Sequence, residues 1–204
     1  DGDLEAAIFV DGAHGQAGAA GTASAPVATI TEGIALAVGA GMAQVYVGGG
    51  VYDETVDLVG GVNLYGGFAY SADERLPPSL RIWAWTRRGD LTWNSSTTTA
   101  TEIHPSGTVG GAPKIPVTCT SETGTTTVSG FYLASDDAAV SGTSSIAVFL
   151  DDCPGLVLEE LVILPGAGAP GQDGATGSTG ASGANGGGGG RNGNNSGGGG
   201  GVSS

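Results

Sequence analysis

A repeat near the end of the apolar part of the chain is the feature that most constrains its fold. Residues 128–133 match residues 158–163 at an offset of 30, with apolar side chains at the first, fourth and sixth places. Further strand-like runs, at 115–120 and 146–150, precede the two copies. Repeats of this length are typical of solenoids, where equivalent side chains of successive coils stack into ladders. Alternating strands of a β-sandwich would give a similar pattern of two copies.

This repeat predicts two rungs of such a ladder. We expect Phe131 to lie over Leu161, and Leu133 over Ile163, because stacked coils align apolar side chains with apolar side chains. Upstream, apolar residues alternate with a period of two, which predicts short strands separated by glycine-rich corners. The alternating pairs are Val45 and Val47, Val56 and Leu58, and Val62 and Leu64.

One amphipathic helix is predicted before these strands. Thr29 and Glu32 have the spacing of a capping box, and Gly39 and Gly41 can end the helix. Its apolar stripe consists of Ile30, Ile34, Ala37 and Val38. A helix with one such stripe packs on a flat apolar surface, so we expect it to cover an end of the β structure.

Four N-terminal segments carry a resemblance to a known family. Residues 8–12, 25–30, 44–56 and 61–68 resemble the start of bacterial right-handed parallel β-helix surface proteins with pectin-lyase-like architecture, and 146–164 resembles them more loosely. The resemblance implies an all-β fold: a short right-handed parallel β-helix with an N-terminal capping α-helix. Because this fold hosts lyases, hydrolases, adhesins and inert surface proteins, it leaves the function open.

Glycine divides the chain into two predicted regions. Residues 1–165 hold nearly all the large apolar side chains and form the β-helix, with a loop excursion at about 69–100. Residues 166–204 form an extended, collagen-like tail, in which glycine recurs at every third position. These glycines are Gly168, Gly171, Gly174, Gly177, Gly180, Gly183, Gly186 and Gly189. Pro170 is the proline inside this run, so a triple helix, a bundle of three-fold glycine helices and a flexible linker all remain open.

Charge and cysteine content favour a secreted protein at the cell surface or in the extracellular space. The formal net charge is −14, which argues against binding of nucleic acid and of anionic membrane surfaces. No apolar run reaches the length that membrane insertion requires. Cys119 and Cys153 either form one disulfide or remain two small buried hydrophobic residues. The start at Asp1 is consistent with removal of a signal peptide, although an excised fragment would look the same.

The excursion contains Trp83, Trp85 and Trp93, together with four of the six basic residues. These tryptophans either pack the excursion against the β-helix or bind a sugar or another partner, because long loops on solenoids often carry binding sites.

The residues that carry chemistry form no catalytic pattern. Asp136 and Asp137 are adjacent, as are Asp151 and Asp152, and neighbours on a strand point to opposite faces. His14 and His104 do not have the spacing of metal ligands. We expect no catalytic residues and no resident cofactor. For calcium, the candidates are Glu122 and Asp152, which the offset of 30 would stack at one corner; a plain solvated corner is the alternative.

Two hypotheses of function follow. In the first, the chain is a non-enzymatic structural or adhesive surface protein that assembles into a homo-oligomer or filament through its tail. In the second, it binds or cleaves carbohydrate, such as a surface polysaccharide, with the tryptophan-rich excursion.

Overall fold

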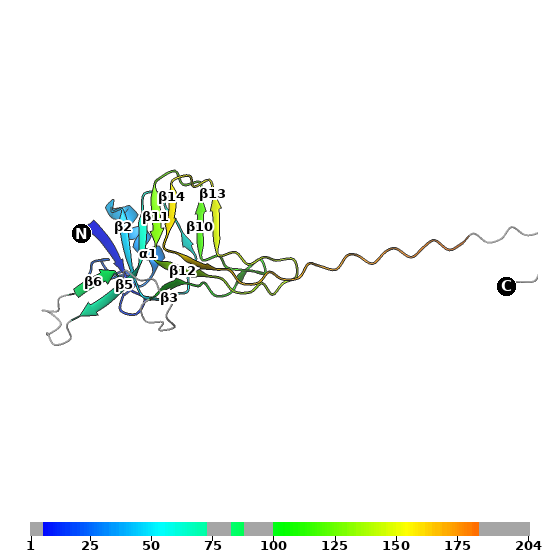
Figure 1. Ribbon diagram of the computed structural model, residues 1–204, viewed down its shortest axis with the longest axis horizontal. Coiled ribbons are helices and arrows are strands. Elements are labelled where there is room, and N and C mark those ends of the chain that lie inside the picture. The colour runs from blue at the N-terminus through cyan, green and yellow to red at the C-terminus, as the bar shows by residue number, and fades with distance from the viewer. Residues whose placement is uncertain (1–5, 73–82, 88–99, 184–204) are drawn as a thin grey trace, which may run out of the picture. The chain divides into compact units, whose positions relative to one another are not determined.

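The structure, a computed structural model, describes residues 6–72, 83–87 and 100–183. Two compact units divide the chain, Asp1–Gln172 and Asp173–Ser204, and every helix and strand of the described residues lies in the first unit. This unit is mostly β, with one short α-helix, as predicted (Figure 1). No helix among the described residues has the length and hydropathy to span a membrane.

Three sheets of parallel strands form the body. The large sheet contains, in spatial order, β1 (Ala7–Val10), β2 (Gln44–Gly48), β5 (Asn63–Ala72), β11 (Thr126–Ser129) and β14 (Leu156–Glu159). The three-stranded sheet has the order β13 (Val148–Asp151), β10 (Val117–Thr120), β4 (Val56–Asp57). The four-stranded sheet has the order β15 (Val162–Leu164), β12 (Phe131–Ala134), β7 (Thr101–Ile103), β3 (Gly50–Tyr52).

Two antiparallel pairings interrupt this arrangement. β6 (Trp83–Arg87) pairs with the end of β5, and β8 (Thr108–Val109) pairs with β9 (Ala112–Pro113). Both lie in segments that connect strands of different sheets.

From β2 onward, the chain visits the sheets in a constant cyclic order: the large sheet, the four-stranded sheet, then the three-stranded sheet. We call any three consecutive strands of this cycle, one from each sheet, a circuit. The predicted offset of 30 is confirmed, because Val128 pairs with Leu158 and Leu133 with Ile163. In the three-stranded sheet Val117 pairs with Val148, so the offset there is 31.

Apolar ladders between circuits form the core. Val45 pairs with Leu64, Leu64 with Val128, and Val128 with Leu158; the first three of these side chains are fully buried. Burial of one Val or Leu side chain stabilises the fold by about 1.5–3 kcal/mol. The ladders are therefore the main source of stability of the body.

The predicted helix is confirmed as α1 (Ile30–Ala40). The Thr29 side chain accepts a hydrogen bond from the Glu32 amide, and Gly41 ends the helix with a φ of 66°. Glu32 does not close the capping box, because its carboxylate accepts from the Gly18 amide instead. The predicted stripe is wrong at one position: Ile30, Ile34 and Ala37 are buried, whereas Val38 is 53% exposed.

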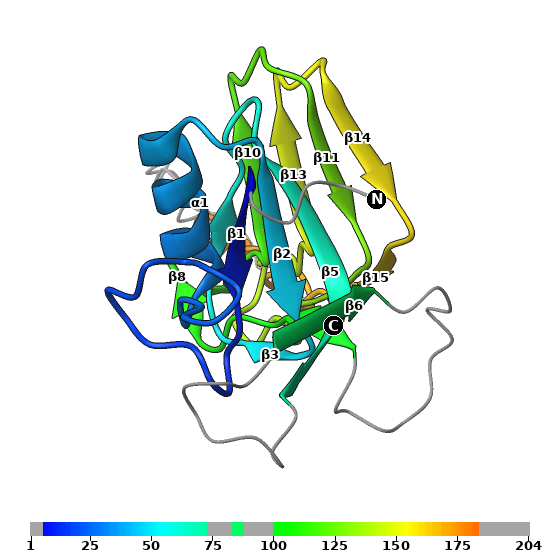
Figure 2. The ribbon, with the colours of Figure 1, turned by 90° about the vertical axis from the view of Figure 1, so that its left-hand side faces the viewer.

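α1 and a loop cover the N-terminal end of the sheets. Gly33 packs so closely that a Cβ there would lie 2.5 Å from Val10 Cγ2. The loop at 21–27 bonds the outer edge of β1, since the Phe9 amide donates to Gly21 O and the Val27 amide donates to Phe9 O. Figure 2 shows α1 and this loop beside β1. Thus α1 packs on the side chains of β1, and the loop hydrogen-bonds to the backbone at its outer edge.

The first unit extends past the predicted boundary at residue 165. The segment 165–172 lies beside 135–143, with hydrogen bonds from the Ala138 amide to Ala167 O and from the Gly142 amide to Pro170 O, both 2.8 Å. The backbone of 165–172 is therefore paired with an earlier segment of the body, and the second unit begins only at Asp173.

Tyr52 joins the end of β2 to the loop after β1. Its hydroxyl donates to Gly48 O at 3.0 Å and accepts from the Gly12 amide at 3.1 Å. Burial of the phenol raises the pKa of Tyr52 above its ordinary value. The ring is therefore neutral and able to donate throughout the physiological range.

We expect Tyr52→Phe to lower the free energy of unfolding by about 1–3 kcal/mol, because the Gly12 amide loses its partner and Gly48 O, which also accepts from the Thr101 hydroxyl, loses one of its donors. Denaturant unfolding measures the change. Val51→Ala, a change to the exposed neighbouring side chain, serves as the control and should shift stability by less than about 0.5 kcal/mol. Equal effects of the two substitutions would show that the hydroxyl is not a specific link.

Candidate functional site

Glycines of the body and of the tail have different surroundings. In the body, Gly60, Gly124 and Gly155 form a ladder at the corner between the three-stranded sheet and the large sheet. A Cβ on Gly124 would lie 2.6 Å from the Gly60 carbonyl carbon, and one on Gly155 would lie 2.6 Å from Gly124 O. Contacts within the chain therefore explain these glycines.

The triplet glycines of the tail have no such explanation. A Cβ added at Gly171, Gly174, Gly177, Gly180 or Gly183 would meet no atom within 4 Å, and none of these residues has a φ in the left-handed region. Any small residue could occupy these positions in a lone chain. Contacts among the described residues therefore do not explain the period of three. Gly186 and Gly189, also predicted for assembly, lie outside the described residues.

The final circuit, β13, β14 and β15, is exposed. Leu158 and Ile163 are 36% and 45% exposed, although their partners one circuit earlier, Val128 and Leu133, are fully buried. Within the described residues no further strand pairs with the outer edges of these three strands. Figure 2 shows β14 at the margin of the large sheet, opposite the covered β1. The C-terminal end is thus apolar and uncovered among the described residues.

Sequence reasoning did not predict this uncovered end. The signal was present, because the second copy of the repeat is followed by glycine-rich sequence and not by a third copy. The last copy of a stacked repeat has one neighbour fewer than the others, so its apolar side chains lack a cover.

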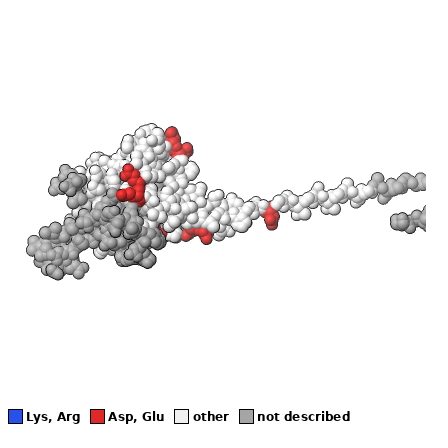
Figure 3. All heavy atoms as spheres, viewed as in Figure 1, with Lys and Arg blue, Asp and Glu red and all other residues white. Residues whose placement is uncertain are grey.

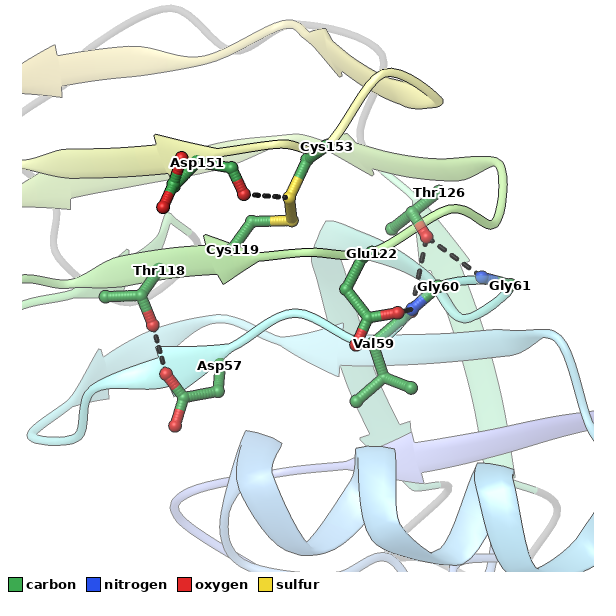
Figure 4. Close-up of a disulfide and its surroundings, with 10 residues drawn as sticks. All are labelled: Asp57, Val59, Gly60, Gly61, Thr118, Cys119, Glu122, Thr126, Asp151 and Cys153. Atoms are coloured by element: carbon green, nitrogen blue, oxygen red, sulfur yellow. Dashed lines mark hydrogen bonds between the residues drawn. A yellow bond between two sulfur atoms is a disulfide. The ribbon is translucent and has the colours of Figure 1, made fainter.

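Cys119 and Cys153 form a disulfide that ties the final circuit to the preceding one (Figure 4). Cys119 belongs to β10, and Cys153 follows β13; their Cα atoms are 6.4 Å apart. This disulfide is one of the two alternatives that the sequence left open; two buried, unbonded cysteines were the other. It closes a loop with a sequence separation of 34 residues.

The register of this sheet shifts the predicted stacking of Glu122 and Asp152 by one residue. Glu122 accepts a hydrogen bond from the Gly60 amide at 2.9 Å, in the corner shown in Figure 4. The offset of 31 in this sheet makes Ser121 the counterpart of Asp152, and both have a φ of 55°. Within the described part of the chain, no group of three or more metal-ligating side chains occurs. Calcium binding stays a prediction.

Other carboxylates near the N-terminal end also serve as hydrogen-bond acceptors within the chain. Glu54 accepts from the Ile30 and Thr31 amides at 2.8 and 2.9 Å, which satisfies donors at the start of α1. Asp57 accepts from the Thr118 hydroxyl. Each of these carboxylates thus has a hydrogen-bonding role within the fold.

The adjacent acidic residues Asp136 and Asp137 have separate partners. Asp136 Oδ1 lies 2.9 Å from His104 Nε2, and Asp137 Oδ1 accepts from the Ala167 amide at 2.6 Å. Asp151 and Asp152 are exposed at the end of β13. On the face shown in Figure 3, the described acidic side chains form small separate groups.

The tryptophan-rich excursion is described only in part. Trp83 and Trp85 lie on β6, where their register partners on β5 are Ala72 and Tyr70. Their side chains and the whole of Trp93 lie outside the described residues. The choice between packing and ligand binding for these residues stays a prediction.

Comparisons with known proteins add no assignment. No protein-family model matches the chain, and no curated protein or solved structure is found similar to it. The fold and the surfaces described above therefore carry the functional argument.

Replacing both cysteines with alanine should lower the free energy of unfolding by about 2–4 kcal/mol, because the unfolded chain gains the entropy of an open loop. Denaturant unfolding with and without a thiol reductant measures this. The reductant should shift the wild type towards the double variant and leave the variant unchanged. An unshifted midpoint in the variant would contradict the stabilising role.

Asp53 should make the stability of the loop after β7 sensitive to acid. Both Ser106 groups, the amide and the hydroxyl, donate to its carboxylate at 2.6 Å, and these bonds lower the pKa of Asp53. A lowered pKa in the folded state contributes stability above the unfolded pKa, and this contribution is lost as the pH falls through the folded pKa.

The midpoint of thermal unfolding of wild type and of Ser106→Ala, measured from neutral pH downward, tests this contribution. The wild type should unfold at the higher temperature at neutral pH, and the difference should shrink below about pH 4, where carboxylates protonate. A difference that is constant over this range would assign the effect to packing.

Proposed function

We propose that this protein is a non-enzymatic, secreted structural or adhesive surface protein, whose body is a rigid spacer and whose tail joins copies of the chain. We further propose that the circuits form a short right-handed parallel β-helix. The constant cyclic order of the sheets and the parallel registers support this fold. The disulfide supports an oxidising, extracellular compartment.

One observation carries the proposal: no contact among the described residues explains the triplet glycines of the tail from Gly171 to Gly183. In a three-chain helix of the collagen type, glycine is required at every third position because only glycine fits at the shared axis. The two intervening positions face outward, and in this tail small or polar residues fill them from Ala169 to Ser182. Tails of several copies packed around one axis would satisfy both features.

The tail has one proline within its triplets, so three-chain association through the tail alone is weak. We expect further contacts between copies to contribute to assembly. The proposal does not need a catalytic group: the described carboxylates in the body, such as Glu54 and Glu122, have structural hydrogen bonds as their evident role.

Alanine substitutions in the tail of the full chain test the proposal. Gly177→Ala with Gly180→Ala should reduce the oligomer mass measured by light scattering, because a methyl group does not fit at a shared axis. Thr176→Ala with Thr179→Ala is the matched control and should leave the mass unchanged. The proposal fails if the two double variants behave alike, or if the wild type is monomeric at all concentrations.

Binding or cleavage of carbohydrate by the excursion is the second candidate. The register of β6 on β5 favours it, since Trp85 lies opposite Tyr70 and two positions from Trp83. A wild-type monomer that binds or depolymerises an acidic polysaccharide would support this candidate against the first.

A further inference from the structure

His104 lies between two carboxylates, one on β7 and one in the segment after β12. Its Nε2 lies 2.9 Å from Asp136 Oδ1, and its Nδ1 lies 3.4 Å from Glu102 Oε1. A neutral imidazole carries one N–H and donates to one of these oxygens, whereas the imidazolium carries two and donates to both. The two contacts together therefore require a proton on each ring nitrogen.

The backbone and the side chain of His104 reach in opposite directions across the four-stranded sheet. The His104 amide donates to Tyr52 O, at the end of β3, at 3.0 Å. The ring reaches the other way, towards Asp136 beyond the end of β12. The His104 side chain is 35% exposed, so protons exchange between the ring and the solvent.

Asp136 belongs to the segment on which the tail begins. We call residues 165–172, which pair with 135–143, the tail root. Ser145 Oγ donates to Asp136 O at 2.8 Å and accepts from the Gly166 amide at 3.0 Å. A Cβ on Gly166 would lie 2.3 Å from Asp136 O, so the tail root packs directly on the backbone of Asp136. A contact that holds Asp136 therefore also supports the tail root.

The other charged groups of this region come from two loops and from the residue next to Asp136. Asp53 follows β3; hydrogen bonds from Ser106 lower its pKa, and the charges of Lys114 and His104 act in the same direction. The Asp137 carboxylate accepts from an amide of the tail root. Of these side-chain types, histidine alone ordinarily changes its charge between about pH 5 and 8.

We propose that His104 is a proton-dependent clasp between β7 and the tail root. With both nitrogens protonated, the ring donates to Glu102 and to Asp136 at once, and the segment after β12 is tied to β7. When one proton leaves, one of the two bonds is lost. The stability that the clasp gives to the tail root is therefore present in mild acid and is lost as the pH rises through the range in which the histidine is deprotonated.

The clasp acts within one chain, so it does not rest on the proposed function. An open clasp weakens the pairing of 165–172 with 135–143 and lengthens the part of the chain that is free of the body. The pH of the surroundings thus sets where the tail separates from the body. Below about pH 4 the carboxylates themselves take up protons, and the clasp opens again.

Titration of the wild type by NMR between pH 8 and pH 5 tests the clasp without any substitution. The amides of Ala138 and Gly142 donate to the tail root, and their signals should shift with the same midpoint as the ring signals of His104. Their protection factors, in which the intrinsic pH dependence of hydrogen exchange cancels, should rise by up to about fivefold towards pH 5, as for a partly exposed ion pair. No change, or a midpoint below about pH 4.5, where carboxylates titrate, would overturn the proposal.

Two variants separate the ring of His104 from the overall charge of the chain. His104→Gln should abolish the pH dependence of this protection between pH 5 and 8, because the amide of glutamine does not titrate. His14→Gln, which removes the histidine beside Asp11, is the matched control and should retain it. The proposal is overturned if both variants retain the dependence, or if both lose it.

The same measurement on the chain with Gly177→Ala and Gly180→Ala distinguishes the clasp from assembly of the tails. The pH dependence should be the same as in the wild type, because none of the contacts of His104 involves these glycines. Loss of the dependence in this variant would assign it to association between copies and would overturn the clasp. A monomeric wild type that keeps the dependence would contradict the proposed assembly and leave the clasp supported.

Discussion

In-register stacking of apolar side chains between successive circuits is the interaction on which the rest of the structure depends. The pairing of Leu64 with Val128, and of Val128 with Leu158, sets the register of the large sheet, and the corners must fit this register. Because the corner glycines Gly60 and Gly124 approach so closely, the backbone of one circuit contacts the next without side chains between them. The same stacking that builds the core leaves its last layer exposed.

Several elements could be predicted from the sequence because their signals are local or periodic. The cap at Thr29 and the end at Gly41 depend on residues within the helix, and the offset between Val128 and Leu158 is visible as a repeat. The predicted apolar stripe of the helix is wrong at Val38, which is exposed. The sequence shows that Val38 is apolar, but it does not show how the helix is rotated about its axis against the sheet.

Other features could not be predicted, since they join residues far apart in the chain. Glu54 caps a helix that begins 24 residues earlier, and the Tyr52 hydroxyl accepts from an amide 40 residues away. The β5–β6 pairing falls in the excursion, which interrupts the period of the repeat between β5 and β11. The triplet glycines were evident in the sequence, but the absence of a steric reason within the chain needed coordinates.

The position of the disulfide determines how a pull on the tail enters the body. A force applied to the tail acts first on the hydrogen bonds between 165–172 and 135–143, and then on β15 and β14, which can separate from their neighbours strand by strand. At Cys153 the load passes through the sulfur–sulfur bond directly to Cys119 in β10. The chain between these two cysteines, including β11, β12 and β13, is bypassed and bears no tension. Under mechanical load the disulfide therefore takes the segment between the two cysteines out of the path of the force, and β10 is the next strand to bear it.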